Sequence, residues 1–204
     1  MRILISAVIG LFSSFCFADC DFYVKRSNDE IDAWLTIKSS IYREMIKDIR
    51  ARPAFGTYII KDSISAKSGN TYARNGRLEI HVNPELSPAR KISTIIFEMS
   101  NVYFNPEHQK IDLLVDKGFI KTKEEFGLAH EIYEYEAIRM HKSVIGDINN
   151  SCNRLPKEFY HLVSIKDRDF EDYKIPDLDR YLENQLKSGH TAHYYLWFSK
   201  RKKI

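Results

Sequence analysis

The sequence predicts an α+β domain that is mainly helical and carries a small antiparallel sheet. Apolar residues recur at helical spacing on both sides of one short segment of strand character. Within that segment Asn75-Gly76 separates two β-rich arms, which is the strongest short signal for a hairpin. No internal repeat interrupts the pattern. We therefore expect a single globular domain over residues 19–204.

Residues 1–18 have the features of a secretory signal peptide. Met1-Arg2 gives a positive start, residues 3–12 are almost entirely apolar, and Ala18 is a small residue at the expected cleavage point. The apolar run is too short to span a bilayer. A buried helix is the alternative, but such a helix seldom begins at the first residue with no polar face. We expect a secreted or periplasmic protein, without a transmembrane segment once the signal is removed.

The cysteines agree with export. The chain has three of them, and removal of the signal takes Cys16 away. Cys20 and Cys152 remain as an even pair in a chain bound for an oxidising compartment, which predicts a disulfide between them. Two separate buried thiols are the alternative. A lipid-bearing Cys20 is disfavoured because Asp19, rather than a small residue, precedes it.

The first half of the domain combines a helix with the sheet. Ser27 has the capping character of a helix start, and the helix is expected to continue to Arg52, where Pro53 ends it. A short β-rich segment follows at 57–61. The second hairpin arm, 77–83, alternates apolar and polar residues, so one of its faces should be buried and the other polar.

The second half is expected to be helical. Ser87 precedes a proline at the first helical position, which predicts a helix over 88–104. A further helix should begin at a proline and cover 106–118. Thr122, with a glutamate three positions later, caps a long helix over 122–148. Shorter helices and an aromatic C-terminal segment complete the chain.

The long helix holds the densest group of ionisable residues. At about 100° per residue, His130, Glu134 and His141 lie within about 40° of one another, beside the apolar stripe. Such a set has the residue types that bind a divalent metal such as zinc. It is equally compatible with a hydrogen-bonded rim next to the core.

A second group centres on Glu98. The order of a strand, a helix carrying Phe97-Glu98-Met99-Ser100-Asn101, and a further helix rich in Glu and His resembles the core of zincin metallopeptidases. In that family the first helix carries His-Glu-x-x-His, whose histidines bind zinc and whose glutamate is the general base. Glu98 matches the base, whereas Phe97 and Asn101 replace both ligands. The resemblance, limited to residues 78–141, implies a zincin-like domain that has lost its metal. The alternative is a plain amphipathic helix.

The same residues also suggest a site without metal. Glu98 and Asn101 are one helical turn apart and are able to face Glu131 or Glu134, and paired carboxylates can divide acid and base roles between them. Glu98 and Glu131 are therefore the candidate catalytic residues. Asn101 is a candidate binding residue, as is His81 on the polar face of its strand.

Two further histidines precede the aromatic C-terminal segment. His190 and His193 have a spacing compatible with metal binding, but we favour the view that they flank a docking segment over 194–198. The sequence contains no Gly-x-Ser-x-Gly motif, phosphate loop or dinucleotide fingerprint. These absences argue against a serine hydrolase of the α/β type and against nucleotide binding through those motifs.

Three functions remain open. The leading hypothesis is an exported zincin-like domain without a cofactor, which binds a protein or a cell-envelope component. The alternative is a hydrolase that gathers Glu98, His130, Glu134 and His141, with or without a divalent metal. The third is a purely structural envelope protein. A net charge of only +3 gives no reason to expect nucleic acid as a partner.

Overall fold

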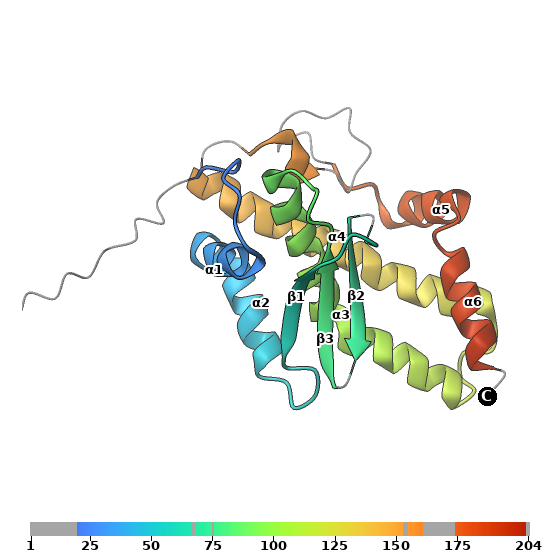
Figure 1. The fold of residues 1–204 in the computed structure, drawn as a ribbon. Helices are drawn as coiled ribbons and strands as arrows, with labels where there is room; N and C mark the ends of the chain where they lie inside the picture. Colours follow the sequence, from blue (N-terminus) through green and yellow to red (C-terminus); the bar gives the residue numbers. More distant parts are fainter. Residues whose placement is uncertain (1–19, 67, 75, 153–154, 161–173, 203–204) are drawn as a thin grey trace, which may run out of the picture.

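The computed structural model confirms the α+β class: helices dominate, and one face of a three-stranded sheet packs against them (Figure 1). It describes residues 20–66, 68–74, 76–152, 155–160 and 174–202. The expected signal peptide, residues 1–18, lies outside the described residues. None of the helices in the described ranges is long and apolar enough to cross a membrane.

The elements follow the chain in an order that places the sheet between two helical parts. The bounds are α1 (Asn28–Lys38), α2 (Ser40–Arg50), β1 (Tyr58–Asp62), β2 (Gly69–Arg74), β3 (Arg77–Val82), α3 (Pro88–Asp116), α4 (Lys123–Cys152), the 3-10 helix η1 (Lys157–Tyr160), α5 (Leu178–Ser188) and α6 (Ala192–Arg201).

The sheet has the strand order β1-β3-β2 and is mixed rather than wholly antiparallel. The expected hairpin is present, since β2 pairs antiparallel with β3, and Gly76 in its turn has a φ of +73°. The parallel pair is β1 and β3, in register from Tyr58↔Leu78 to Asp62↔Val82. The sheet is mixed because β3 lies between β1 and β2. The strands β1 and β2 are consecutive in the chain but are not neighbours in the sheet. β2 is left as an edge strand.

The main core lies between the sheet and α3. Leu78, Ile80 and Val82 of β3 are fully buried and belong to one cluster with the apolar residues of α3. Helices α1 and α2 cover the β1 side, and α6 lies on the β2 side (Figure 1). Alternation along β3 places Glu79 and His81 on the opposite face of the sheet from α3.

The first predicted helix is interrupted. Ser39 is extended, with φ −128° and ψ 121°, and it ends α1 and caps α2. Asp147 of α4 stabilises this break because its Oδ2 accepts hydrogen bonds from the hydroxyls of Ser39 and Ser40, each at 3.0 Å. Asp147 is more than a hundred residues from Ser39 in the chain, so the sequence alone predicted one continuous helix.

The two predicted helices over 88–104 and 106–118 are instead one helix, α3, with Pro106 inside it. A proline in a helix cannot donate to the carbonyl four residues earlier, which here belongs to Val102. Arg52 supplies the missing donors: its Nη1 donates to the Val102 carbonyl at 3.0 Å and its Nη2 to the Tyr103 carbonyl at 2.7 Å. The guanidinium therefore lets the helix continue past the proline.

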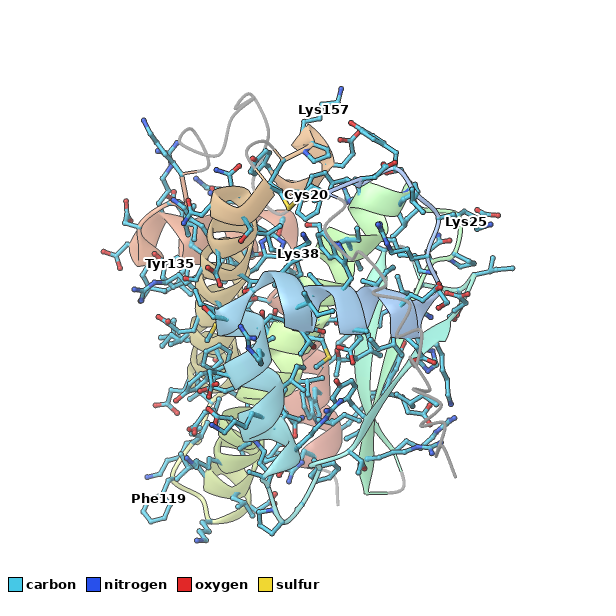
Figure 2. All side chains as sticks on the ribbon, turned by 90° about the vertical axis from the view of Figure 1, so that its left-hand side faces the viewer. Cys20, Lys25, Lys38, Phe119, Tyr135 and Lys157 are labelled. Carbon is cyan, nitrogen blue, oxygen red and sulfur yellow. A yellow bond between two sulfur atoms is a disulfide. The ribbon has the colours of Figure 1, made fainter. Side chains whose placement is uncertain are left out.

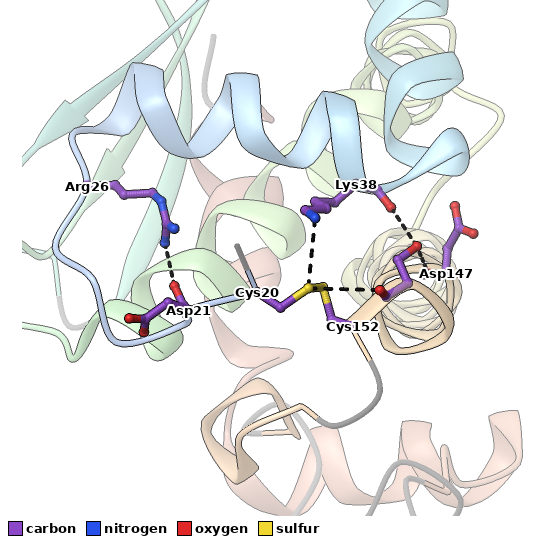
Figure 3. Close-up of a disulfide and its surroundings, with 7 residues drawn as sticks. Cys20, Asp21, Arg26, Lys38, Asp147 and Cys152 are labelled. Atoms are coloured by element: carbon purple, nitrogen blue, oxygen red, sulfur yellow. Dashed lines mark hydrogen bonds between the residues drawn. A yellow bond between two sulfur atoms is a disulfide. The ribbon is translucent and has the colours of Figure 1, made fainter. Parts of the chain in front are cut away.

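The predicted disulfide is present: the sulfur atoms of Cys20 and Cys152 are bonded, with Cα atoms 5.5 Å apart (Figure 3). The bridge fastens the segment before α1 to the end of α4. Lys38 Nζ lies 3.8 Å from Cys20 Sγ at the end of α1, and Figure 2 shows the two residues as neighbours. The start of the described chain is thus fixed to the middle of the sequence.

A second, smaller apolar cluster holds α6 against the far ends of α3 and α4. Its buried members are Ile111, Val115, Phe126, Tyr194 and Phe198. Close approach of α6 to α4 requires Gly127, because a Cβ there would lie 2.7 Å from Tyr195 Cε1 and 2.9 Å from Thr191 Cγ2. This contact fixes the position of α6 along α4.

Candidate functional site

A polar cleft of about 350 Å³ lies between the edge strand β2 and helices α3, α4 and α6. This volume suits a small molecule or one side chain of a larger ligand. The lining residues are Gly69, Asn70, Thr71, Phe97, Glu98, Asn101, Asn105, His108, Glu134, His190, His193, Tyr194 and Trp197. Three of the sequence-predicted site residues, Glu98, Asn101 and Glu134, are therefore brought together here.

Glu98 is a carboxylate in a nearly dry position. It is only 5% exposed, and its Oε2 accepts a hydrogen bond of 2.7 Å from the hydroxyl of Thr71 on β2. The pKa of Glu98 is raised to about 7, chiefly by burial and also by the nearby charge of Glu134. Hydrogen bonds from Thr71 and Asn101 act in the opposite direction. Near neutral pH this carboxyl group therefore exchanges a proton readily.

Glu134 faces the same cleft from α4. The hydroxyl of Tyr194 on α6 donates to its Oε1 at 2.8 Å. Burial raises the pKa of Glu134, and the neighbouring carboxylate of Glu131 contributes in the same direction. The charge of Glu134 also contributes to the raised pKa of Glu98, so ionisation of Glu134 disfavours ionisation of Glu98.

Glu131 lies behind the cleft and organises its neighbours. Its Oε1 accepts from the Thr191 hydroxyl and contacts His190 Nδ1, both at 2.9 Å, while its Oε2 accepts from the Tyr181 hydroxyl at 3.2 Å. The hydrogen bond with Glu131 raises the pKa of His190. Glu131 therefore serves to orient His190, whose ring lines the cleft, rather than to face a ligand itself.

Two stacked histidines, His108 and His130, lie beside the cleft, and His108 lines it. His108 Nδ1 and His130 Nδ1 are 2.6 Å apart, so one ring must donate a proton and the other accept it. Burial lowers the pKa of His108 to about 4 and that of His130 to about 2, which keeps both rings neutral. His130 Nε2 and Asp112 Oδ1 are buried 3.9 Å apart, without hydrogen-bond partners among the described residues.

The expected metal set has separate partners rather than one shared position. His130 contacts His108, Glu134 contacts Tyr194, and His141 Nε2 lies 2.8 Å from the Ser93 hydroxyl. Within the described ranges, no three His, Cys, Asp or Glu side chains are arranged to hold a metal ion.

His81 is also away from the cleft. Its Nε2 lies 3.3 Å from Glu79 Oε2, on the face of the sheet opposite α3, so His81 is separated from the other candidate binding residue, Asn101. The strand alternation predicted its polar face correctly. It did not show which face α3 would cover, because that depends on the packing of the whole sheet.

Several lining residues were missed or assigned a lesser role. His190 and His193 were expected only to flank a docking segment, yet both border the cleft, as do His108 and Trp197. Gly69 carried no sequence signal. A Cβ at Gly69 would lie 2.8 Å from Glu98 Oε1 and 2.7 Å from Thr94 Cγ2, so the strand approaches the carboxylate only because this residue is glycine.

Comparisons with protein families, with curated proteins and with solved structures found no match. The site must therefore be interpreted from its own chemistry. The cleft holds one buried carboxylate, Glu98, and one half-buried carboxylate, Glu134, beside a histidine held by a third carboxylate. Such a set can bind polar groups and can transfer protons.

Proposed function

We propose that this chain is an exported hydrolase in which Glu98 is the acid–base residue of the cleft. The observation that carries the proposal is the convergence of Glu98 and Glu134 on one cavity, where burial raises the pKa of both carboxyl groups and the charge of Glu134 contributes to the shift at Glu98. A general base is most effective when its pKa lies near the working pH, and about 7 satisfies this condition for Glu98. The zincin-like relationship is part of the proposal, with Phe97 and Asn101 lining the cleft in place of metal ligands.

In the proposed reaction Glu98 accepts a proton from the water that attacks the substrate. The same carboxyl group then returns the proton to the leaving group. His190, whose pKa is raised through its hydrogen bond to Glu131, supplies positive charge to the oxygen that becomes negative in the transition state. The disulfide between Cys20 and Cys152 supports an oxidising location outside the cytoplasm.

The test compares wild-type protein with Glu98→Gln and with Glu124→Gln. Glu124 is on the same helix as Glu134, but its side chain is 63% exposed, which makes it a matched control. The substrate panel contains quenched fluorescent peptides and simple esters. We expect a loss of roughly 10²–10⁴-fold in hydrolysis for Glu98→Gln and wild-type rates for the control.

A second candidate is a binding protein that acts on a protein or envelope partner without hydrolysis. The observation in its favour is the aromatic wall formed by Phe97, Tyr194 and Trp197 beside the acids. If no member of the panel is hydrolysed while ligands still bind in the cleft, this candidate replaces the hydrolase. Hydrolysis that persists undiminished in Glu98→Gln also contradicts the assigned role.

A further inference from the structure

We infer that the cleft selects ligands carrying an organic cation, an ammonium or guanidinium group, which is held chiefly by Glu134 and the oxygen of Asn101 beside the rings of Tyr194 and Trp197. This inference rests on the proposed function and names its substrate class. It divides the two carboxylates by role: Glu134 anchors the substrate and Glu98 transfers the proton.

The first argument is charge. Among the described residues that line the cleft there is no lysine or arginine. His108 and His193 are kept neutral because burial lowers their pKa, and His190 is engaged by Glu131. His190, whose pKa is raised, is the cationic side chain of the lining, and its hydrogen bond goes to Glu131 rather than to Glu98 or Glu134. No lysine or arginine of the lining therefore competes with a ligand cation for these two carboxylates.

The second argument is a comparison within the molecule. Glu79 is about as buried as Glu98, and there the chain provides its own cations, Lys61 Nζ at 3.0 Å and Arg77 Nη2 at 3.1 Å, beside His81 Nε2 at 3.3 Å. These partners lower the pKa of Glu79 to about 2. Glu98 and Glu134 receive hydroxyl donors instead, from Thr71 and Tyr194. The fold thus gives lysine and arginine partners to Glu79, whereas among the described residues it gives none to the cleft pair.

The third argument is hydrogen bonding. Asn101 Oδ1 is buried and has no hydrogen-bond partner among the described residues, although its residue lines the cleft. Tyr194 occupies Oε1 of Glu134, and the other carboxylate oxygen has no donor within the described part of the chain. Both acceptors call for N–H donors, which ammonium and guanidinium groups carry in numbers.

The fourth argument is the aromatic wall. The rings of Tyr194 and Trp197 are stacked with an angle of 24° and centroids 6.3 Å apart, and both border the cleft. Aromatic faces attract cations, most strongly where water is excluded. An alkyl chain that ends in a cation can therefore pack its apolar part against these rings while its charged end binds the carboxylate of Glu134.

The test compares three ligands with five carbon atoms in a straight chain: pentylamine, pentanol and pentanoate. Butylguanidine is added as a second cation. Binding to the full-length mature chain is measured at pH 7.5 by NMR titration and calorimetry. We expect both cations to bind at least about tenfold more tightly than pentanol, and pentanoate to bind least. If one cation binds more tightly than the other, the difference shows whether the cleft prefers an ammonium or a guanidinium group.

The variants Glu134→Gln and Glu124→Gln locate the selectivity. We expect Glu134→Gln to lose the preference for cations while Glu124→Gln keeps it, with circular dichroism establishing that both are folded. Should Glu134→Gln not fold, Asn101→Leu, which removes the other acceptor, is expected to weaken cation binding. Equal binding of pentylamine and pentanol, a preference that survives Glu134→Gln, or binding of Zn²⁺ without binding of either organic cation would overturn the inference. If any of these results is obtained while Glu98→Gln still loses hydrolysis, the inference about the cation fails and the proposed function stands.

Discussion

The substitution Glu98→Gln should make the protein more stable at alkaline pH, and by a predictable amount. The ordinary pKa of a glutamate is 4.5, whereas burial and the charge of Glu134 raise that of Glu98 to about 7 in the folded chain. The folded state therefore holds the proton more tightly than the unfolded state between these values. The stabilisation that this proton provides is complete below pH 4.5 and is lost as the pH rises through 7.

The size of the effect follows from the same values. At 1.36 kcal/mol for each pKa unit, the gap between 4.5 and about 7 corresponds to about 3 kcal/mol of free energy of unfolding. Glutamine has no charge to desolvate, and its amide oxygen can still accept from the Thr71 hydroxyl. The stability of Glu98→Gln relative to wild type should consequently increase by about 3 kcal/mol between pH 4.5 and pH 8.

Urea denaturation followed by circular dichroism at the two pH values measures this difference. Glu124→Gln is the control, since its exposed side chain should leave the pH dependence of wild type unchanged. A stability difference between Glu98→Gln and wild type that is the same at pH 4.5 and pH 8 would refute the reasoning. It would mean that the Glu98 carboxylate is solvated or paired with a cation in solution.

Two other substitutions and the reduction of the disulfide test the fold and the cleft. Arg52→Ala should lower the free energy of unfolding by about 2 kcal/mol. The loss should be smaller in a Pro106→Ala background, because residue 106 then has an N–H that can donate to the Val102 carbonyl. Additive losses in a double-mutant cycle would contradict this coupling. Gly69→Ala should displace the carboxylate 2.8 Å away and shift its NMR titration midpoint, whereas an unchanged midpoint would show that the strand moves instead. Loss of the Cys20–Cys152 disulfide should reduce stability by up to about 5 kcal/mol in denaturation with and without reductant, and a change below about 1 kcal/mol would argue against the bridge.

Features with a local physical cause could be predicted from the sequence. The capping box of Ser27 and Glu30, the proline after Ser87 and the hairpin turn at Gly76 involve only neighbours in the chain. The same holds for Thr122, whose hydroxyl accepts from the Glu125 amide at 3.2 Å. In each case the residues that make the interaction are within a few positions, so their spacing is enough.

Features that depend on distant partners were missed. The continuation of α3 past Pro106 depends on Arg52, and the break at Ser39 depends on Asp147. The parallel pairing of β1 follows from where β3 enters the sheet. For the site, helical spacing grouped His130 with His141, but each histidine met a different residue of α3, His108 and Ser93 respectively. Periodicity predicts a face of a helix, whereas the packing of other elements decides what that face meets.

The cleft departs from the rules that the rest of the fold obeys, and this departure favours a function there. Glu79, another buried acid, has lysine and arginine partners, whereas the cleft offers its carboxylates asparagine, threonine, tyrosine and histidine. The cost falls on the folded state, because the unfolded chain ionises Glu98 freely. A disulfide that closes a long loop acts mainly on the unfolded chain and so offsets such a cost without touching the site. The bridge from Cys20 joins α4, the helix that also carries Glu134, and it does so at the end remote from α6. The covalent constraint therefore allows the cleft to keep carboxylates that fold stability alone would disfavour, as long as the protein stays in an oxidising compartment.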